Sequence, residues 1–193
     1  MVAVKTTSRA MIRKKIISFL KATSALPDKK KGKYRCGMIH RNALVLATSY
    51  RDVPRATALE FFHEGLTLYI LAGPGGKIVN IKRNPRVSAF IYEQPLDHAV
   101  VQRSLQLFGR AELVNIRNNL RLFKAKVKKW NLYRVIETLM SSKIKEEGVT
   151  GKAAKKMVEE GLYAHNIIKI IPDHIIYKEY PPNFTVRRYE WKE

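Results

Sequence analysis

The stretch LYILAGPGGKIVNIKRNPRV, residues 68–87, predicts a strand, a sharp glycine-rich turn and the start of a helix, in that order. Three glycines within residues 73–76 permit backbone angles that other residues rarely adopt, and Lys77 follows them directly. Pro85 disfavours helical geometry at the residue before it, so the helix must end near Asn84. Local chemistry alone therefore predicts one strand-to-helix transition.

This turn also has the chemistry of a phosphate site. Amide N–H groups in the first turn of a helix have no partner within the helix, and the helix dipole is positive there, so a phosphate can bind; Lys77 adds a full charge. A Walker-type loop is excluded because Leu71 stands at its first glycine position and Ile78 follows the lysine. The dinucleotide-binding pattern G-x-G-x-x-G is also incomplete, because Ile78 stands where its third glycine would be. Two interpretations stay open: a phosphate-binding turn, or a turn that holds nothing.

Short apolar runs and turns alternate on both sides of this stretch. We expect strands over residues 43–48, 55–62, 66–71, 86–92, 100–113, 166–171 and 174–180, with turns at 50–54 and 63–65. Pro172 is expected to break the last two strands apart. Residues 115–161 have helical spacing, which predicts two or three helices. The pattern favours a mainly β protein with added helices (α+β), a small closed antiparallel barrel, over a doubly wound parallel sheet.

The N-terminal region is basic, since its first acidic residue is Asp28, and it can form an amphipathic helix. The apolar positions of this helix are Met11, Ile12, Ile16, Phe19 and Leu20. We favour a helix packed on the domain over an organelle presequence or a membrane-surface helix. A solvated basic segment, residues 27–33, follows. We expect residues 1–33 to be an N-terminal helix and linker, and 34–193 to be one barrel domain with a helical insertion at about 115–161.

Composition limits the function classes. The formal net charge of +21 can attract phosphates, nucleic acid or anionic lipid. A single cysteine, Cys36, excludes an intrachain disulfide, and no apolar run approaches the roughly 18 residues of a spanning helix, so we expect a cytoplasmic protein without a membrane span. The five histidines have no metal-ligand spacing, and we expect no metal site. They are His40, His63, His98, His165 and His174.

A group of lysines between residues 124 and 129 could form a nucleic-acid face, because phosphate contacts need clustered cations. The aromatic residues beside them, Phe123 and Trp130, fall on one apolar stripe with Leu120 and Val127. Aromatic side chains in such a stripe fill a core rather than stack on bases. We therefore do not expect nucleic acid to be a partner.

Six segments carry a family resemblance between about Ala43 and Val114. They are residues 43–48, 53–58, 68–70, the glycine turn with Lys77, 80–88 and 107–113. No segment is distinctive by itself, but the ordered set resembles the pyridoxamine 5'-phosphate oxidase-related family of FMN-binding split β-barrels. The resemblance implies a six-stranded antiparallel split β-barrel that binds FMN.

The same resemblance implies a homodimer with two FMN sites between the subunits. Residues 57–59 would run beside the flavin ring and ribityl chain, with residues 70–71 on the neighbouring strand. Residues 75–77 would meet the phosphate, and residues 102 and 104 would reach the cofactor from another strand. The cofactor-binding residues expected in this way are Arg55, Thr57, Ala58, Leu59, Ile70, Leu71, Gly75, Gly76, Lys77, Gln102 and Ser104.

The sequence departs from the family at two places. Members that hold the phosphate strongly have Ser-Arg-Lys or Ser-Lys-Lys where this chain has Gly75-Gly76-Lys77, so one hydroxyl and one cation are missing. Arg55, or a basic residue from the opposite subunit, could compensate. The family oxidase's C-terminal Arg-Leu-His-Asp-Arg type run is also absent from residues 186–191, so we do not expect oxidation of vitamin B6.

The function expected from these features is an FMN-dependent oxidoreductase that moves hydride or electrons to or from a small molecule. No residue is assigned as a catalytic acid or base. The alternatives are a basic nucleic-acid-binding barrel, or a member of the same fold that binds haem or a deazaflavin.

Overall fold

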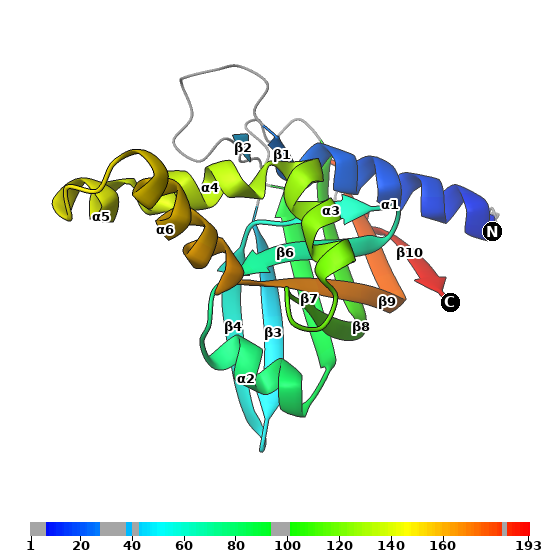
Figure 1. Cartoon of the computed structure of the whole chain (residues 1–193). Coiled ribbons are helices and arrows are strands. Elements are labelled where there is room, and N and C mark those ends of the chain that lie inside the picture. The colour runs from blue at the N-terminus through cyan, green and yellow to red at the C-terminus, as the bar shows by residue number, and fades with distance from the viewer. Residues whose placement is uncertain (1–6, 28–37, 40–42, 94–100, 183–184) are drawn as a thin grey trace, which may run out of the picture.

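A computed structural model describes residues 7–27, 38–39, 43–93, 101–182 and 185–193 (Figure 1). Its helices are α1 (Arg9–Thr23), α2 (Gly76–Arg83), α3 (Leu120–Trp130), α4 (Leu132–Leu139), α5 (Ser141–Glu146) and α6 (Gly151–Tyr163). Its strands are β1 (Leu26–Pro27), β2 (Met38–Ile39), β3 (Leu44–Tyr50), β4 (Val53–Leu59), β5 (Phe62–Glu64), β6 (Thr67–Ala72), β7 (Arg86–Glu93), β8 (Gln102–Val114), β9 (Asn166–Tyr180) and β10 (Arg187–Lys192). The predicted class, mainly β with added helices, is confirmed.

The main sheet has the strand order β4-β3-β7-β8-β9-β6-β5, and β10 pairs with β9 outside this path. Every described strand pair is antiparallel. The antiparallel barrel predicted from the sequence is therefore confirmed, with two strands, β5 and β10, beyond the six expected. β1 and β2 form a separate pair.

The prediction that Pro172 separates two strands is wrong. β9 continues through Pro172, which lies at a shift of register between β8 and β9, where Phe108 faces His174 and Gly109 faces Pro172. A Cβ atom on Gly109 would lie 2.2 Å from the carbonyl oxygen of Ile171, so only glycine permits the backbones to approach this closely. A bulge accommodates a residue that cannot donate to the ladder, and it bends the strand instead of ending it.

The predicted hairpin before the glycine turn and the helix after it are present, but the expected strand over 55–62 is wrong: β4 ends at Leu59, and residues 62–64, part of the expected turn at 63–65, form β5. β3 and β4 make a hairpin whose turn residues, Arg51 and Asp52, have φ of 51° and 57°, as in a type I′ turn. α2 begins directly at the glycine turn and ends at Arg83, before Asn84 and Pro85. These two elements lie side by side at one end of the barrel (Figure 1).

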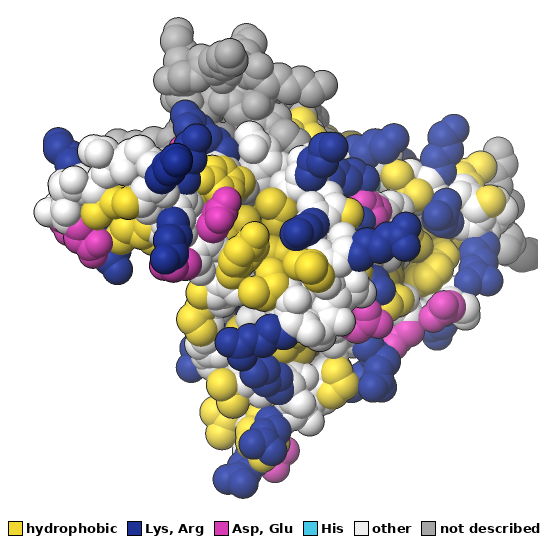
Figure 2. All heavy atoms as spheres, in the orientation of Figure 1, with side chains coloured by type: hydrophobic (Ala, Val, Ile, Leu, Met, Phe, Trp, Pro, Cys, Tyr) yellow, Lys and Arg dark blue, Asp and Glu magenta, His cyan; other side chains and the backbone are white. Residues whose placement is uncertain are grey.

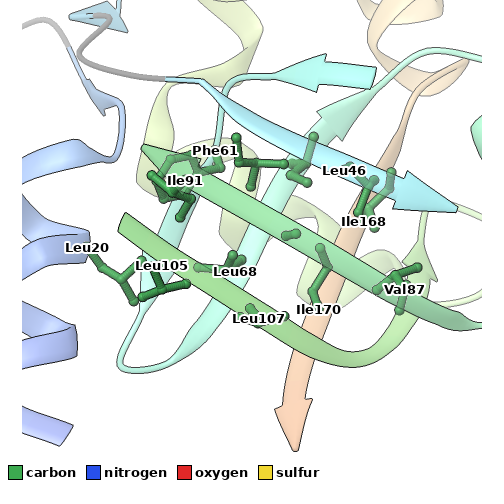
Figure 3. Packing of buried hydrophobic residues seen from close by; sticks show 14 of the residues in the cluster. Leu20, Leu46, Phe61, Leu68, Val87, Ile91, Leu105, Leu107, Ile168 and Ile170 are labelled. Atoms are coloured by element: carbon green, nitrogen blue, oxygen red, sulfur yellow. The ribbon is translucent and has the colours of Figure 1, made fainter. Parts of the chain in front are cut away.

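The N-terminal helix packs on the barrel, as the favoured interpretation predicted. Ile16, Phe19 and Leu20 are fully buried and belong to the same core as the strand residues. Figure 3 shows Leu20 of α1 beside Leu105 of β8. The expected basic linker falls largely in residues 28–33, outside the described residues.

Helices α3 to α6 follow β8 and cover a second apolar cluster. Phe123 has 0% and Trp130 5% of its surface exposed, so both fill a core, as expected. Lys126 is buried with them: its ammonium bonds to Glu64 and lies 4.5 Å from the ring centre of Tyr69. Burial, with the nearby charge of Glu64, raises the pKa of Tyr69 to about 12. The lysine group of α3 is therefore not a uniform cationic face.

A buried carboxylate, Glu179 of β9, joins α1 and β10 to the barrel. The Lys15 ammonium donates to it at 2.8 Å, and the hydroxyls of Tyr177 and Tyr189 donate to it at 3.2 Å each. Burial opposes ionisation of Glu179, but these donors outweigh it and hold the pKa of Glu179 below its ordinary value of 4.5.

We predict that Glu179→Gln lowers the free energy of unfolding at pH 7 by about 1–2 kcal/mol, because a charged hydrogen bond is lost while the partly exposed Lys15 regains some hydration. A depressed folded pKa gives stability that is present above about pH 4.5 and is lost as the pH falls through the folded value. Urea unfolding should therefore show the wild-type advantage at pH 7 and a smaller one at pH 3. The exposed Glu146→Gln is the control; an equal difference at both pH values would contradict this account.

Candidate functional site

A hollow of about 420 Å³ lies between β4 and α2. Its lining residues, which define the β4–α2 hollow, are Val53, Pro54, Arg55, Ala56, Gly76, Val79 and Asn80. Two of the predicted cofactor residues, Arg55 and Gly76, are among them. The hollow is open to solvent at the N-terminal end of a helix, which is where a phosphate would be expected to bind.

The glycine turn contributes Gly76 to the lining of this hollow. Gly75 has φ of 145°, a conformation that favours glycine, and caps α2 by accepting hydrogen bonds from the amides of Ile78 and Val79 at 3.0 and 3.2 Å. The amides of Gly76 and Lys77, in the first turn, have no acceptor within the helix. They can donate to an anion, and the half-buried Lys77 begins the same turn.

Arg55 occupies the space that a side chain at position 76 would need. A Cβ atom on Gly76 would lie 2.8 Å from the central carbon of the Arg55 guanidinium. The strand β4 thus places a guanidinium directly against the N-terminus of α2. Because Gly76 has no side chain, the Arg55 guanidinium from β4 can occupy this position.

Side-chain hydrogen bonds fix α2 in this place. The Asn80 amide donates to the hydroxyl of Thr48 at 3.2 Å, and the Asn84 amide donates to the carbonyl of Ser49 at 3.1 Å. Both partners lie on β3, next to β4, and Ile78 of α2 is buried below. The helix N-terminus therefore has a defined position relative to Arg55.

The other predicted residues on β4 and β6 are divided between surface and core. Ala58 is exposed, and Thr57 and Leu59 are half-buried on the same strand. Ile70 has only 1% of its surface exposed, so its side chain belongs to the barrel core; Leu71, beside it, is half-buried. Any contact of Ile70 with a ligand would have to come from its backbone.

Within one chain, Gln102 and Ser104 do not reach the β4–α2 hollow. The register places Arg55 in line with Thr48, Val87 and Gly109 across the sheet, so Ser104 lies five residues further along β8, a rise of roughly 17 Å. Ser104 is also buried, with its hydroxyl 3.5 Å from that of Tyr180. Gln102 accepts a hydrogen bond from the Tyr92 hydroxyl at 2.9 Å.

Five lining residues of the β4–α2 hollow were not predicted. They are Val53, Pro54, Ala56, Val79 and Asn80. Asn80 could have been found, because it is four residues after Gly76 and so lies on the same face of the helix. The β4 residues depend on which strand packs beside the helix, which no local pattern indicates.

Within the described part of the chain, no three His, Cys, Asp or Glu side chains lie close enough to hold a metal ion. None of the described helices combines the length and apolar character that crossing a bilayer requires.

The sequence matches the family model described as pyridoxamine 5'-phosphate oxidase over residues 31–157, well over half of the chain. A search of curated proteins finds no match. Among solved structures, General Stress Protein 26 from Bacillus anthracis str. Sterne is similar at 20% identity and a TM-score of 0.51, covering 92% of this chain and 98% of that one.

Two further structures share the fold at 12% identity. PhzG from Burkholderia lata 383, in complex with tetrahydrophenazine-1-carboxylic acid, has a TM-score of 0.56 and covers 98% of this chain and 89% of that chain. A heme binding protein from Mycobacterium smegmatis has a TM-score of 0.52 and covers 98% of this chain and 60% of that chain. At these identities the structural likeness establishes the fold and no ligand. Together with the matched segment and the antiparallel barrel, it shows that the chain belongs to the pyridoxamine 5'-phosphate oxidase family.

Proposed function

We propose that this protein binds FMN, with the phosphate in the β4–α2 hollow, and that it is an oxidoreductase. The observation that carries the proposal is the Arg55 guanidinium held against Gly76 at the N-terminus of α2. Arg55 and the first-turn amides are donors that suit a phosphate, and Lys77, which follows Gly76 but does not line the hollow, would have to turn its side chain toward the phosphate to add a second cation. FMN, when bound, supplies hydride or electron transfer, and the chain binds and orients it.

The flavin ring has a suitable surface along β4. β4 is at the end of the strand order, and among the described strands it pairs only with β3. Its outer backbone N–H and C=O groups are therefore available to the polar edge of a ring. Thr57, Ala58 and Leu59 continue along this strand from Arg55, so a ligand anchored at the phosphate end can extend beside them.

A homodimer would complete the site. The outer face of the sheet carries apolar side chains in one row, since Ala58, Val45 and Phe90 are paired in register; Val45 is 40% and Phe90 44% exposed. A two-fold axis that lies in this face and runs perpendicular to the strands would reverse the strand direction of the partner. Such an axis would bring the end of the partner that carries Gln102 near the flavin beside β4. The face offers the apolar surface that a stable dimer buries.

The phosphate contacts can be tested by comparing FMN with riboflavin, which lacks the phosphate. We predict that Arg55→Ala and Lys77→Ala each weaken FMN binding by about 10- to 150-fold, the equivalent of about 1.5–3 kcal/mol for a charged hydrogen bond, and change riboflavin binding little. Flavin fluorescence quenching in titrations of the apoprotein measures both affinities.

The matched control for these two variants is Lys14→Ala, which removes one exposed positive charge from α1. Equal losses of affinity for FMN and riboflavin, or a loss of FMN affinity in the control, would show that the phosphate does not bind in this hollow. A purified protein that takes up no FMN, or that carries a haem spectrum, would overturn the cofactor assignment itself.

Oxidoreductase activity is tested separately on the loaded protein. Under anaerobic conditions, added NADH or NADPH should bleach the flavin absorption, and admission of an acceptor should restore it. Bleaching by dithionite but by neither nicotinamide would indicate a different donor, and a flavin resistant to both would contradict redox function.

The dimer face is tested by placing a charge within it. We predict that Phe90→Glu shifts the protein toward monomer in analytical ultracentrifugation and weakens FMN binding in parallel, because the site would lose its second subunit. Leu139→Glu is the control, since Leu139 is 68% exposed on α4 and outside this face. An unchanged sedimentation coefficient for Phe90→Glu would exclude this face as the interface.

A further inference from the structure

A second hollow, of about 210 Å³, lies where the last turn of α2 meets the turn after β8 and the end of α6. We call it the α2–α6 hollow; the lining residues that matter below are Lys82, Asn115, Arg117, His165 and Asn166. Lys82 follows Asn80 by two residues, which separates them by about 200° around the helix axis. The α2–α6 hollow is therefore on the opposite flank of α2 from the β4–α2 hollow, and the two share no lining residue.

The charged side chains that line this hollow, Lys82 and Arg117, are both positive. Lys82 and Arg117 are exposed, no carboxylate lines the hollow, and neither cation forms an ion pair with another described residue. Figure 2 shows Lys and Arg side chains gathered over the region of α2 on this face. Two cations that share a concave site without a counter-charge attract an anion more strongly than separate surface cations do.

The turn that carries Arg117 is held by its own hydrogen bonds. The Asn115 side-chain oxygen accepts from the amides of Arg117 and Asn118 at 2.9 and 3.2 Å, and the Asn118 side-chain oxygen accepts from the amide of Asn115 at 2.9 Å. This arrangement fixes the backbone from which the Arg117 side chain extends. Less side-chain and backbone freedom is then lost when an anion binds.

Asn166 and His165 also line the hollow, and a hydrogen bond fixes each side chain. The Asn115 amide donates to the Asn166 side-chain oxygen at 2.9 Å, which leaves the Asn166 NH₂ group available as a donor. His165 Nδ1 lies 2.7 Å from the carbonyl of Gly161; since a carbonyl only accepts, Nδ1 carries a hydrogen. His165 Nε2 is then directed away, 3.4 Å from the position of a Cβ on Gly73.

We propose that the α2–α6 hollow is a second anion site that binds a compact phosphate-bearing small molecule, independently of FMN. Residues that carry a guanidinium, an ammonium and an amide NH₂ line the hollow from three segments of the chain, and three such donors suit an anion with three terminal oxygens better than a planar carboxylate with two. The hollow is half the volume of the β4–α2 hollow and accommodates a phosphate with only a small attached group.

The test uses inorganic phosphate as the probe, at constant ionic strength, on the full chain labelled with ¹⁵N. We expect saturable NMR shifts at the Arg117, His165 and Asn166 amides and at the Asn166 side-chain NH₂, with acetate at the same concentration producing much smaller shifts. Arg117→Ala and Lys82→Ala should each weaken phosphate binding at least fivefold. The phosphate affinity of Arg117→Lys, which keeps the charge but loses the paired donors of the guanidinium, should lie between the affinities of Arg117→Ala and the wild type.

Two controls separate this site from the FMN proposal and from diffuse attraction. The double variant Arg55→Ala/Lys77→Ala should keep the phosphate shifts at Arg117, whatever its effect on FMN, and Lys14→Ala should leave them unchanged. Equal shifts with acetate, unsaturable shifts, or wild-type affinity in Arg117→Ala with its thermal unfolding unchanged would each overturn the proposal. Loss of the shifts in the double variant would show that phosphate binds only in the β4–α2 hollow, and this result would also overturn the proposal of a second site.

Discussion

The barrel depends on the close approach of β8 and β9 at Gly109. These are the two longest strands, and they pair along their whole length, with β6 continuing the sheet beside the first half of β9 and β10 beside the second. β9 can pair with β6 in its first half and with β10 in its second half because it bends at the bulge opposite Gly109. A Cβ atom at position 109 would clash with the carbonyl of Ile171. The bend lets β9 contribute to the barrel core on both sides of Pro172, through Ile168 and Ile170 and through Ile175 and Tyr177.

Most of the fold could be predicted from the sequence because its strands are short, apolar and separated by turn residues. Two of the exceptions depend on long-range contacts. Pro172 predicts the end of a strand when only its sequence neighbours are considered. Its actual position opposite Gly109 depends on pairing with a strand about 60 residues earlier in the chain. β10 was missed because its residues are charged and mostly exposed; pairing with β9 and the hydrogen bond from Tyr189 to Glu179 hold it, and neither is visible in a local pattern.

The candidate site divides in the same way. The glycine turn and Lys77 form one local motif, so their chemistry could be predicted from spacing. The contact of Arg55 with Gly76 joins two segments that are adjacent only because Asn80 and Asn84 fix α2 onto β3. Gln102 and Ser104 were assigned from the family resemblance, and one chain places them at the far end of the barrel. Whether they belong to the site depends on a second subunit, which the sequence of one chain does not specify in space.

The two anion sites that we propose beside α2 would attract anions for different physical reasons. At the N-terminus the helix dipole and free amides assist Arg55 and Lys77, so part of the attraction is built into the backbone. The α2–α6 hollow lies at the C-terminal ends of α2 and α6, where each dipole contributes about half a negative charge and opposes an anion. Binding there must come from the full charges of Lys82 and Arg117, so it depends more steeply on ionic strength than binding at the N-terminus. The same helix can therefore hold two anions by means that respond differently to the surrounding salt.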